Sequence, residues 1–217
     1  MTKRTAMRQA RIQQALCAGV AAALTLAAWS GASAQTGRRG RAAAPAAPAP
    51  AAPAKPSPGA GPLIVFETAK GSFEMETYPN EAPKSVEHIL KLVKRNFYNG
   101  RRVHRVIPGQ LVQFGDPLSR DVSKRDYWGT GGSGSPIGVA EMDKKRRHVV
   151  GAVALAHPGD PRSADSQLYV MLMPQPKYDG KYTVIGRVIN GMEVVQKLSE
   201  LDVIRRATVK EPTRGTE

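Results

Sequence analysis

Short runs of apolar or alternating residues, separated by glycine-rich joints, recur through the chain from residue 63 onward. Runs of this length that are rich in β-branched and aromatic side chains are typical of strands. We expect strands at 63–68, 72–78, 103–107, 111–114, 148–156, 167–173 and 182–189, with a last one at 207–210. So many short strands favour a closed barrel or a sandwich, because closure removes exposed strand edges.

Two segments of this region carry a helical pattern. Residues 82–95 place four apolar side chains on one face at helical spacing: Val86, Ile89, Leu90 and Val93. Basic residues gather at the end of the segment, and Asn80 or Glu81 is placed to cap its start. A second, shorter helix is expected at 192–198, so the fold class is mainly β with two helices.

The first 34 residues contain no acid, and they open with four basic residues before an apolar stretch at about 15–29. This stretch is shorter than the ~20 residues that cross a bilayer, and Ala32-Ser33-Ala34 matches a signal-peptidase site. We therefore expect a secretory signal peptide at 1–34 and an exported protein, periplasmic or secreted. An uncut signal that anchors the N-terminus is the alternative.

Residues 35–61 consist almost entirely of alanine, proline and glycine, with four basic side chains and no large apolar residue. Such a composition favours disorder, and proline-rich chain extends by ~3.1 Å per residue, so we expect a linker that acts as a spacer. The remaining residues, 62–217, suit a single folded domain.

The formal charge of +14 is unevenly distributed. The first two segments hold four basic residues each and no acid, which leaves +6 for residues 62–217. Basic proteins favour polyanions, but export separates this chain from nucleic acid, so we expect no nucleic-acid partner. Contact between the basic linker and anionic envelope surfaces is one interpretation, and a plain contribution to solubility is the other.

Several chemistries are excluded by the residues present. The single cysteine, Cys17, lies in the apolar stretch, so the chain from residue 35 has no thiol for disulfides or zinc. The G-x-G-x-x-G pattern at 129–134 is followed by Pro136 rather than by a helix, so we interpret it as a loop. Ser166 lacks a nucleophile-elbow context. No metal-ligand spacing links the four histidines: His88, His104, His148 and His157.

Four segments, taken together and in order, resemble the cyclophilin family. They are VHRVIPGQLVQFGDP from Val103, GTGGSG from Gly129, GAVALAHPGDPRSADSQLYVML from Gly151 and YDGKYTVIGRVINGMEVV from Tyr178. The similarity extends over nearly all of residues 62–202. It implies a closed eight-stranded antiparallel β-barrel capped by two α-helices, peptidyl-prolyl cis/trans isomerase activity, no cofactor, and a peptide groove on the outer face.

The resemblance also assigns roles to individual residues. Arg105 corresponds to the catalytic arginine, and Gln113, also placed with the catalytic group, would hold the peptide backbone together with Gln167. Leu111 and Tyr169 would line an apolar pocket for the proline ring. The full substrate-binding set that the resemblance implies is Leu111, Gln110, Gly129, Ala156, His157, Gln167, Tyr169 and Tyr182.

These residue types suit the reaction. Rotation about an X-Pro bond crosses a barrier of ~18–20 kcal/mol because amide resonance is lost midway, yet no bond is made or broken. A catalyst needs a site that fits the twisted amide better than either planar form. The proline nitrogen gains a lone pair as resonance breaks, so a guanidinium donor such as Arg105 would stabilise that state.

Six positions near the groove depart from the family pattern. They are Gln110 for a phenylalanine, Phe114 for a glycine, His157 for an asparagine, Asp165 for a small residue, Lys177 for the tryptophan of cyclosporin-sensitive members, and Tyr182 for a histidine. We expect a more polar pocket and weak cyclosporin binding.

Three functions stay open at this point. The first is a monomeric isomerase that acts on proline-containing unfolded or flexible polypeptides and assists the folding of exported proteins. The second is a proline-peptide binding module with little or no catalysis. The third is an envelope-associated scaffold in which the basic linker recruits anionic surfaces.

Overall fold

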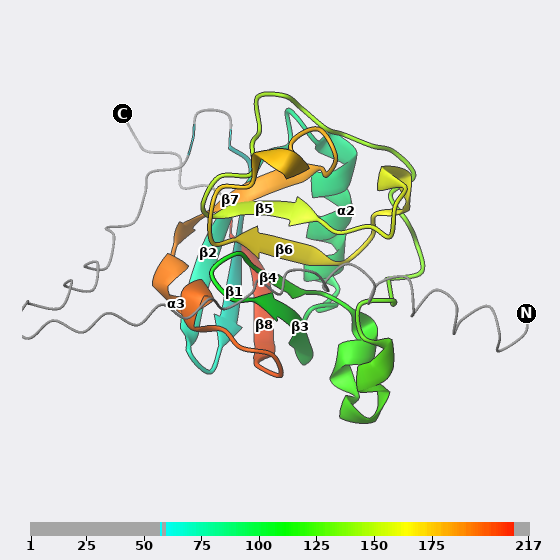
Figure 1. Ribbon diagram of the computed structural model, residues 1–217, viewed down its shortest axis with the longest axis vertical. Coiled ribbons are helices and arrows are strands. Elements are labelled where there is room, and N and C mark those ends of the chain that lie inside the picture. The colour runs from blue at the N-terminus through cyan, green and yellow to red at the C-terminus, as the bar shows by residue number, and fades with distance from the viewer. Residues whose placement is uncertain (1–56, 58–59, 211–217) are drawn as a thin grey trace, which may run out of the picture. The chain divides into compact units, whose positions relative to one another are not determined.

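The computed structural model describes residues 57 and 60–210, which fold as a closed barrel of eight strands (Figure 1). The strand order around the barrel is β1-β2-β7-β5-β6-β4-β3-β8, and every neighbouring pair is antiparallel. The expected closed antiparallel barrel is therefore confirmed. The predicted signal segment and nearly all of the predicted linker lie outside the described residues.

The strands match the expected runs closely, with two instructive differences. Their bounds are β1 Leu63–Thr68, β2 Gly71–Thr77, β3 Arg101–Ile107, β4 Leu111–Phe114, β5 Ala152–Leu155, β6 Leu168–Met171, β7 Val184–Asn190 and β8 Val203–Lys210. The run at 148–156 shortens because Gly151, at φ +80°, ends a turn in which Val149 and Val150 are exposed. β8 starts earlier than expected because Val203 and Ile204 already pair with Arg102 and Arg101 of β3, and Ile204 also pairs with Thr68 of β1.

The barrel interior is packed with aromatic rings. Phe66 stacks on Phe73 at 5.0 Å between ring centroids and meets Phe114 edge to face at 5.2 Å. Phe114 is fully buried in this core, so the expectation that it alters the peptide groove is wrong. Successive strand residues face opposite sides, so Gln113 points outward and Phe114 inward.

Helix α2, Pro83–Lys94, packs against the barrel core through Val86, Ile89, Leu92 and Val93. The N-cap position is Ala82, whose methyl side chain makes no cap, so the expected cap position at Asn80 or Glu81 is one or two residues too early. The carboxylate of Glu141 instead accepts hydrogen bonds from two backbone amides of the first turn, at 3.1 and 2.8 Å. A carboxylate is favourable there because the helix start carries unpaired N–H groups and partial positive charge.

The other helical segments are short. They are α3 at Met192–Lys197 and 3₁₀ turns at Pro117–Arg120, Val122–Tyr127, Pro161–Ser163 and Pro176–Tyr178. The two expected α-helices are thus present. Within residues 57 and 60–210, no helix has both the length and the apolar character needed to cross a membrane.

Candidate active site

A row of polar side chains crosses the outer face of three neighbouring strands. Arg105 on β3 lies opposite Gln113 on β4, which in turn lies opposite Tyr169 on β6. The Arg105 guanidinium donates to Gln113 Oε1 at 3.4 Å, and Gln113 Nε2 donates to Gln167 Oε1 at 2.9 Å. Gln167 Nε2 then donates to the carbonyl of Gly131 at 2.8 Å. We call Arg105, Gln113 and Gln167 the polar row.

The polar row is buried at its two glutamines and exposed to solvent at Arg105. Gln113 and Gln167 are each 8% exposed, and their mutual hydrogen bond determines which end of each amide donates. Arg105 is exposed, and within the described residues its guanidinium has this single, long hydrogen bond. Most of its five N–H donors are therefore available to a ligand on the outer face.

An apolar cluster lies on the same outer face, separate from the barrel core. Leu111 and Tyr169 are buried in it, and Ala156 and Tyr182 pack against it half-buried. The structure thus brings these four predicted residues together. The remaining members are Tyr78, Ile107, Ala152, Ala154, Met171, Tyr178 and Val184.

Three tyrosines form one wall of this cluster. Their rings all contact one another: the centroid distances are 6.3 Å for Tyr169–Tyr178, 5.3 Å for Tyr178–Tyr182 and 5.8 Å for Tyr169–Tyr182, with interplanar angles of 65–90°. Gln110 Nε2 donates to the Tyr178 hydroxyl at 3.1 Å, which places Gln110 at the rim. His157 lies against Tyr182 at 4.5 Å between centroids. We call the cluster with this wall the tyrosine pocket, because it is the site that the resemblance assigns to the proline ring; one wall is aromatic, and polarity enters through the hydroxyl and amide groups.

Sequence reasoning missed three residues of the tyrosine pocket. Tyr178 was not singled out, although it opens one of the matched segments, and Asp179 follows it. His148 is 2% exposed behind the pocket, where Nδ1 lies 2.9 Å from Asp179 Oδ1 and Nε2 lies 2.9 Å from the Tyr169 hydroxyl. No local pattern marks His148, because its partners are 31 and 21 residues away in sequence.

Gly129 belongs neither to the polar row nor to the tyrosine pocket. Its φ of +90° suits a glycine, and its amide donates to the buried carboxylate of Asp116. It faces the ring of His104, and the carbonyl that touches the polar row is that of Gly131. The glycine-rich loop therefore contributes to the site through its backbone at Gly131, two residues beyond the predicted position.

His104 lies next to Arg105 on β3 and is buried. Neither ring nitrogen has a hydrogen-bond partner within the described part of the chain. Burial lowers the pKa of His104, because the charged imidazolium loses hydration there. Among residues 57 and 60–210, no three histidine, cysteine or acidic side chains are grouped so that they could hold a metal ion.

Asp165 fastens the glycine-rich loop to α2. Its carboxylate accepts from Ser133 Oγ at 2.6 Å and from the Gly134 amide at 3.2 Å, and it pairs with His88 Nε2 at 2.9 Å. Burial alone would raise the pKa of Asp165, but the hydrogen bonds from His88 and Ser133 outweigh it and lower the pKa. Asp165 therefore acts on the loop rather than on the groove itself.

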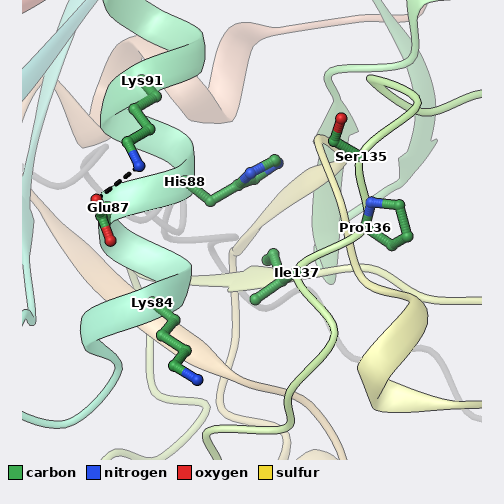
Figure 2. Close-up of a pocket in the computed structure, with 7 residues that line it drawn as sticks. All are labelled: Lys84, Glu87, His88, Lys91, Ser135, Pro136 and Ile137. Carbon is green, nitrogen blue, oxygen red and sulfur yellow. Dashed lines mark ion pairs between the residues drawn. The ribbon is translucent and has the colours of Figure 1, made fainter.

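A shallow hollow of about 310 Å³ lies between α2 and residues 135–137 (Figure 2). Figure 2 shows His88 reaching from the helix toward Ser135, while Lys91 turns back to its ion-pair partner Glu87. None of the residues that line this hollow belongs to the polar row or the tyrosine pocket. The two sites are therefore distinct.

Comparison with known proteins shows which family the chain resembles. Residues 63–214 match the family model described as cyclophilin type peptidyl-prolyl cis-trans isomerase/CLD. A probable peptidyl-prolyl cis-trans isomerase of Brucella abortus (strain 2308) is 37% identical over 154 residues, which cover 70% of this chain and 78% of that protein. Peptidyl-prolyl cis-trans isomerase CYP18-2 of Arabidopsis thaliana is 34% identical over 148 residues, covering 66% and 84%.

Solved structures show the same fold. A cyclophilin-type isomerase of Cryptosporidium parvum superposes with a TM-score of 0.62 at 20% identity, covering 70% of this chain and 99% of that one. Cyclophilin AquaCyp293 of Hirschia baltica gives 0.57 at 23% identity, covering 67% and 73%. With the family match and the curated relatives, these findings show that the chain belongs to the cyclophilin-type peptidyl-prolyl cis-trans isomerases.

Proposed function

We propose that this isomerase acts on X-Pro bonds of exported polypeptides, with Arg105 as the catalytic donor and the tyrosine pocket as the site of the proline ring. The observation that carries the proposal is the chain of hydrogen bonds from Arg105 through Gln113 to Gln167, beside a cluster of buried apolar side chains on the same outer face. Cyclophilins bind proline-containing peptides, and a pocket next to a fixed polar row suits such a ligand.

The proposed step is rotation of one side of the X-Pro bond against the other. Leu111 and Tyr169 hold the proline ring, while Gln113 and Gln167 hold the neighbouring backbone. As the amide twists, its nitrogen becomes pyramidal and gains a lone pair that an Arg105 N–H can meet. This interaction exists only near the transition state, so it raises the rate rather than the affinity alone.

The energy required is within reach of these groups. A 10⁵-fold acceleration needs about 7 kcal/mol of differential stabilisation, since each tenfold factor corresponds to about 1.4 kcal/mol. Loss of one fixed donor to a developing charge costs about 100- to 1,000-fold in rate in other enzymes. Desolvation and positioning by the pocket would supply the rest.

The test follows cis-to-trans relaxation of a short peptide with one Ala-Pro bond at low temperature, where the uncatalysed rate is slow. We expect the purified protein to accelerate relaxation, and Arg105→Ala to lower kcat/KM by about 100- to 1,000-fold. Arg205→Ala, on the exposed side of β8, is the matched control and should leave the rate unchanged. No acceleration by the folded wild type would leave a proline-peptide binding module as the better account.

Export is the second part of the proposal. The basic start, the apolar stretch and Ala32-Ser33-Ala34 support a cleaved signal and a periplasmic or secreted protein. Expression of the full chain in a bacterium, with the mature N-terminus read by mass spectrometry, should give Gln35 as the first residue. A membrane-bound product that retains residues 1–34 would instead support the N-terminal anchor.

The basic linker is the third part. Four basic residues without an acid in 35–61 support weak contact with anionic envelope surfaces. Deletion of residues 35–56 removes all four basic residues but keeps Ser57, which hydrogen-bonds the buried carboxylate of Glu76; it should reduce retention on phosphatidylglycerol vesicles at low salt and leave isomerisation unchanged. Equal retention of both forms would reduce the linker to a spacer.

A further inference from the structure

The hydrogen bonds around His148 connect three elements behind the tyrosine pocket. His148, just before β5, bonds the Tyr169 hydroxyl on β6 and the carboxylate of Asp179, which follows the 3₁₀ turn that carries Tyr178. Asp179 Oδ1 also accepts from the His148 amide at 2.8 Å, and the His148 carbonyl accepts from the Gln175 amide at 2.7 Å. This one residue therefore ties Tyr169 on β6 to the segment that carries Tyr178 and Asp179.

The direction of each hydrogen bond follows from the chemistry of the partners. A carboxylate only accepts, so Nδ1–H of His148 donates to Asp179. Burial lowers the pKa of His148 although Asp179 raises it, so the ring is neutral near pH 7. Nε2 then carries a lone pair and must accept from the Tyr169 hydroxyl. This hydrogen bond fixes the hydroxyl end of the Tyr169 side chain. The His148 and Tyr169 rings lie nearly parallel, with 6.0 Å between their centroids and an interplanar angle of 14°.

We infer that His148 and Asp179 are positioning residues for the proline pocket, which act through the Tyr169 hydroxyl and set substrate affinity rather than the rate of rotation. The inference rests on the proposed function of the tyrosine pocket and adds the groups that hold it in shape. Neither residue belongs to the polar row, so the Arg105 donor is unaffected by them.

Protonation of His148 would reverse the bond to Tyr169, since Nε2 would then donate and the hydroxyl proton would need another acceptor. The groups that face His148 are Asp179, Tyr169, Tyr178 and Tyr182, and the charge of Arg147 acts on Asp179. Asp179 is the single carboxylate among them, and it already accepts from Nδ1 and from the backbone. Affinity should therefore fall as the pH drops through the pKa of His148, below its usual value near 6.5.

The decisive experiment is a double-mutant cycle on His148 and Tyr169, read as the Kd of an Ala-Pro peptide by NMR titration and as kcat by exchange. His148→Gln should raise Kd and KM about 5- to 10-fold, the size of one lost hydrogen bond, and change kcat less than about twofold. In the Tyr169→Phe background the same substitution should change Kd less than about twofold, because the hydroxyl is already gone. An equal effect in both backgrounds, or a loss confined to kcat, would overturn the inference.

Two further variants keep the test decisive if His148→Gln folds poorly. Asp179→Asn removes the charge that raises the His148 pKa, so the acid fall in affinity should move to lower pH; an unchanged profile would contradict the inference. Glu87→Gln, in an exposed ion pair on α2, is the matched control and should leave affinity and its pH profile unaltered. Because Kd is read by titration, absent catalysis would refute the proposed function without hiding the result for His148.

Discussion

The polar row and the tyrosine pocket lie side by side on the same face, yet they are built differently. Arg105 and Gln113 pair across strands β3 and β4, next to a register shift between Val103 and Arg105, and Gln167 directly precedes β6. Two of the three tyrosines of the wall come from segments outside the strands, because Tyr178 lies in a 3₁₀ turn and Tyr182 precedes β7. None of the six departures from the family pattern lies in the polar row. Four of them lie in or beside the tyrosine pocket: Gln110, His157, Lys177 and Tyr182.

The contrast has a physical cause. Gln113 and Gln167 are buried and hydrogen-bonded to each other, so removal of either side chain leaves a buried amide group of the other unpaired. An apolar pocket needs only the right volume and shape, which several combinations of side chains can provide. We therefore expect the row to determine turnover and the pocket to determine affinity.

After Arg105→Ala, the largest effect that sharpens this comparison is expected at Gln113. Gln113→Ala removes the hydrogen bond to Gln167 and the one from Arg105, leaving both neighbours free to reorient. A loss of about 1–3 kcal/mol of transition-state stabilisation corresponds to about 5- to 150-fold in kcat/KM. Gln196→Ala, on the exposed side of α3, is the matched control. A normal kcat with only a raised KM would place Gln113 with the pocket instead.

A smaller effect is expected at Tyr178, which contacts both other rings of the tyrosine wall. Tyr178→Ala removes the edge contacts to Tyr169 and Tyr182. It also removes the hydroxyl that accepts a hydrogen bond from Gln110 Nε2. At about 0.5–1.5 kcal/mol for aromatic contacts, the peptide Kd should rise about 2- to 10-fold while kcat stays unchanged. Tyr127→Ala, at a site 63% exposed, controls for loss of a tyrosine. A fall in kcat of similar size would break the division between row and pocket.

The smallest effect on activity is expected at Asp165, which contacts neither the polar row nor the tyrosine pocket directly. Asp165→Ala should release residues 133 and 134 from α2 and lower the free energy of unfolding by about 1–3 kcal/mol. Activity should fall only about twofold, since Gln167 still meets the Gly131 carbonyl. Amide exchange at Gly134 and thermal unfolding measure the two effects, with Asp126→Ala as the exposed control. Unchanged exchange at Gly134 would show that the loop is held by other contacts.

Local patterns in the sequence predicted most of the fold. Alternation and helical spacing placed the strands and α2 to within a few residues, because these elements bury one face each. The inward direction of Phe114 was also predictable, since Gln113 precedes it on the same strand and must face outward. The cap of α2 could not be predicted, because Glu141 lies 56 residues from Ser85, whose backbone amide donates to it.

The candidate site divides in the same way. Arg105, Gln113 and Leu111 fall within a single short motif, so an ordered match to the family located them. The environment of Tyr169 could not be foreseen, because the pairing of its hydroxyl with His148 requires the barrel to close first. Long-range contacts of this kind depend on register, which no local pattern fixes.

The most direct test of the division between row and pocket is the interconversion rate of an enzyme-bound Ala-Pro peptide, measured by NMR exchange at saturating peptide. Saturation removes differences in affinity, so the measured rate reports rotation alone. We predict that Arg105→Ala lowers this rate by about 100- to 1,000-fold and that Tyr178→Ala leaves it within about twofold of wild type. Equal losses in the two variants, or an unchanged rate in Arg105→Ala, would contradict the account.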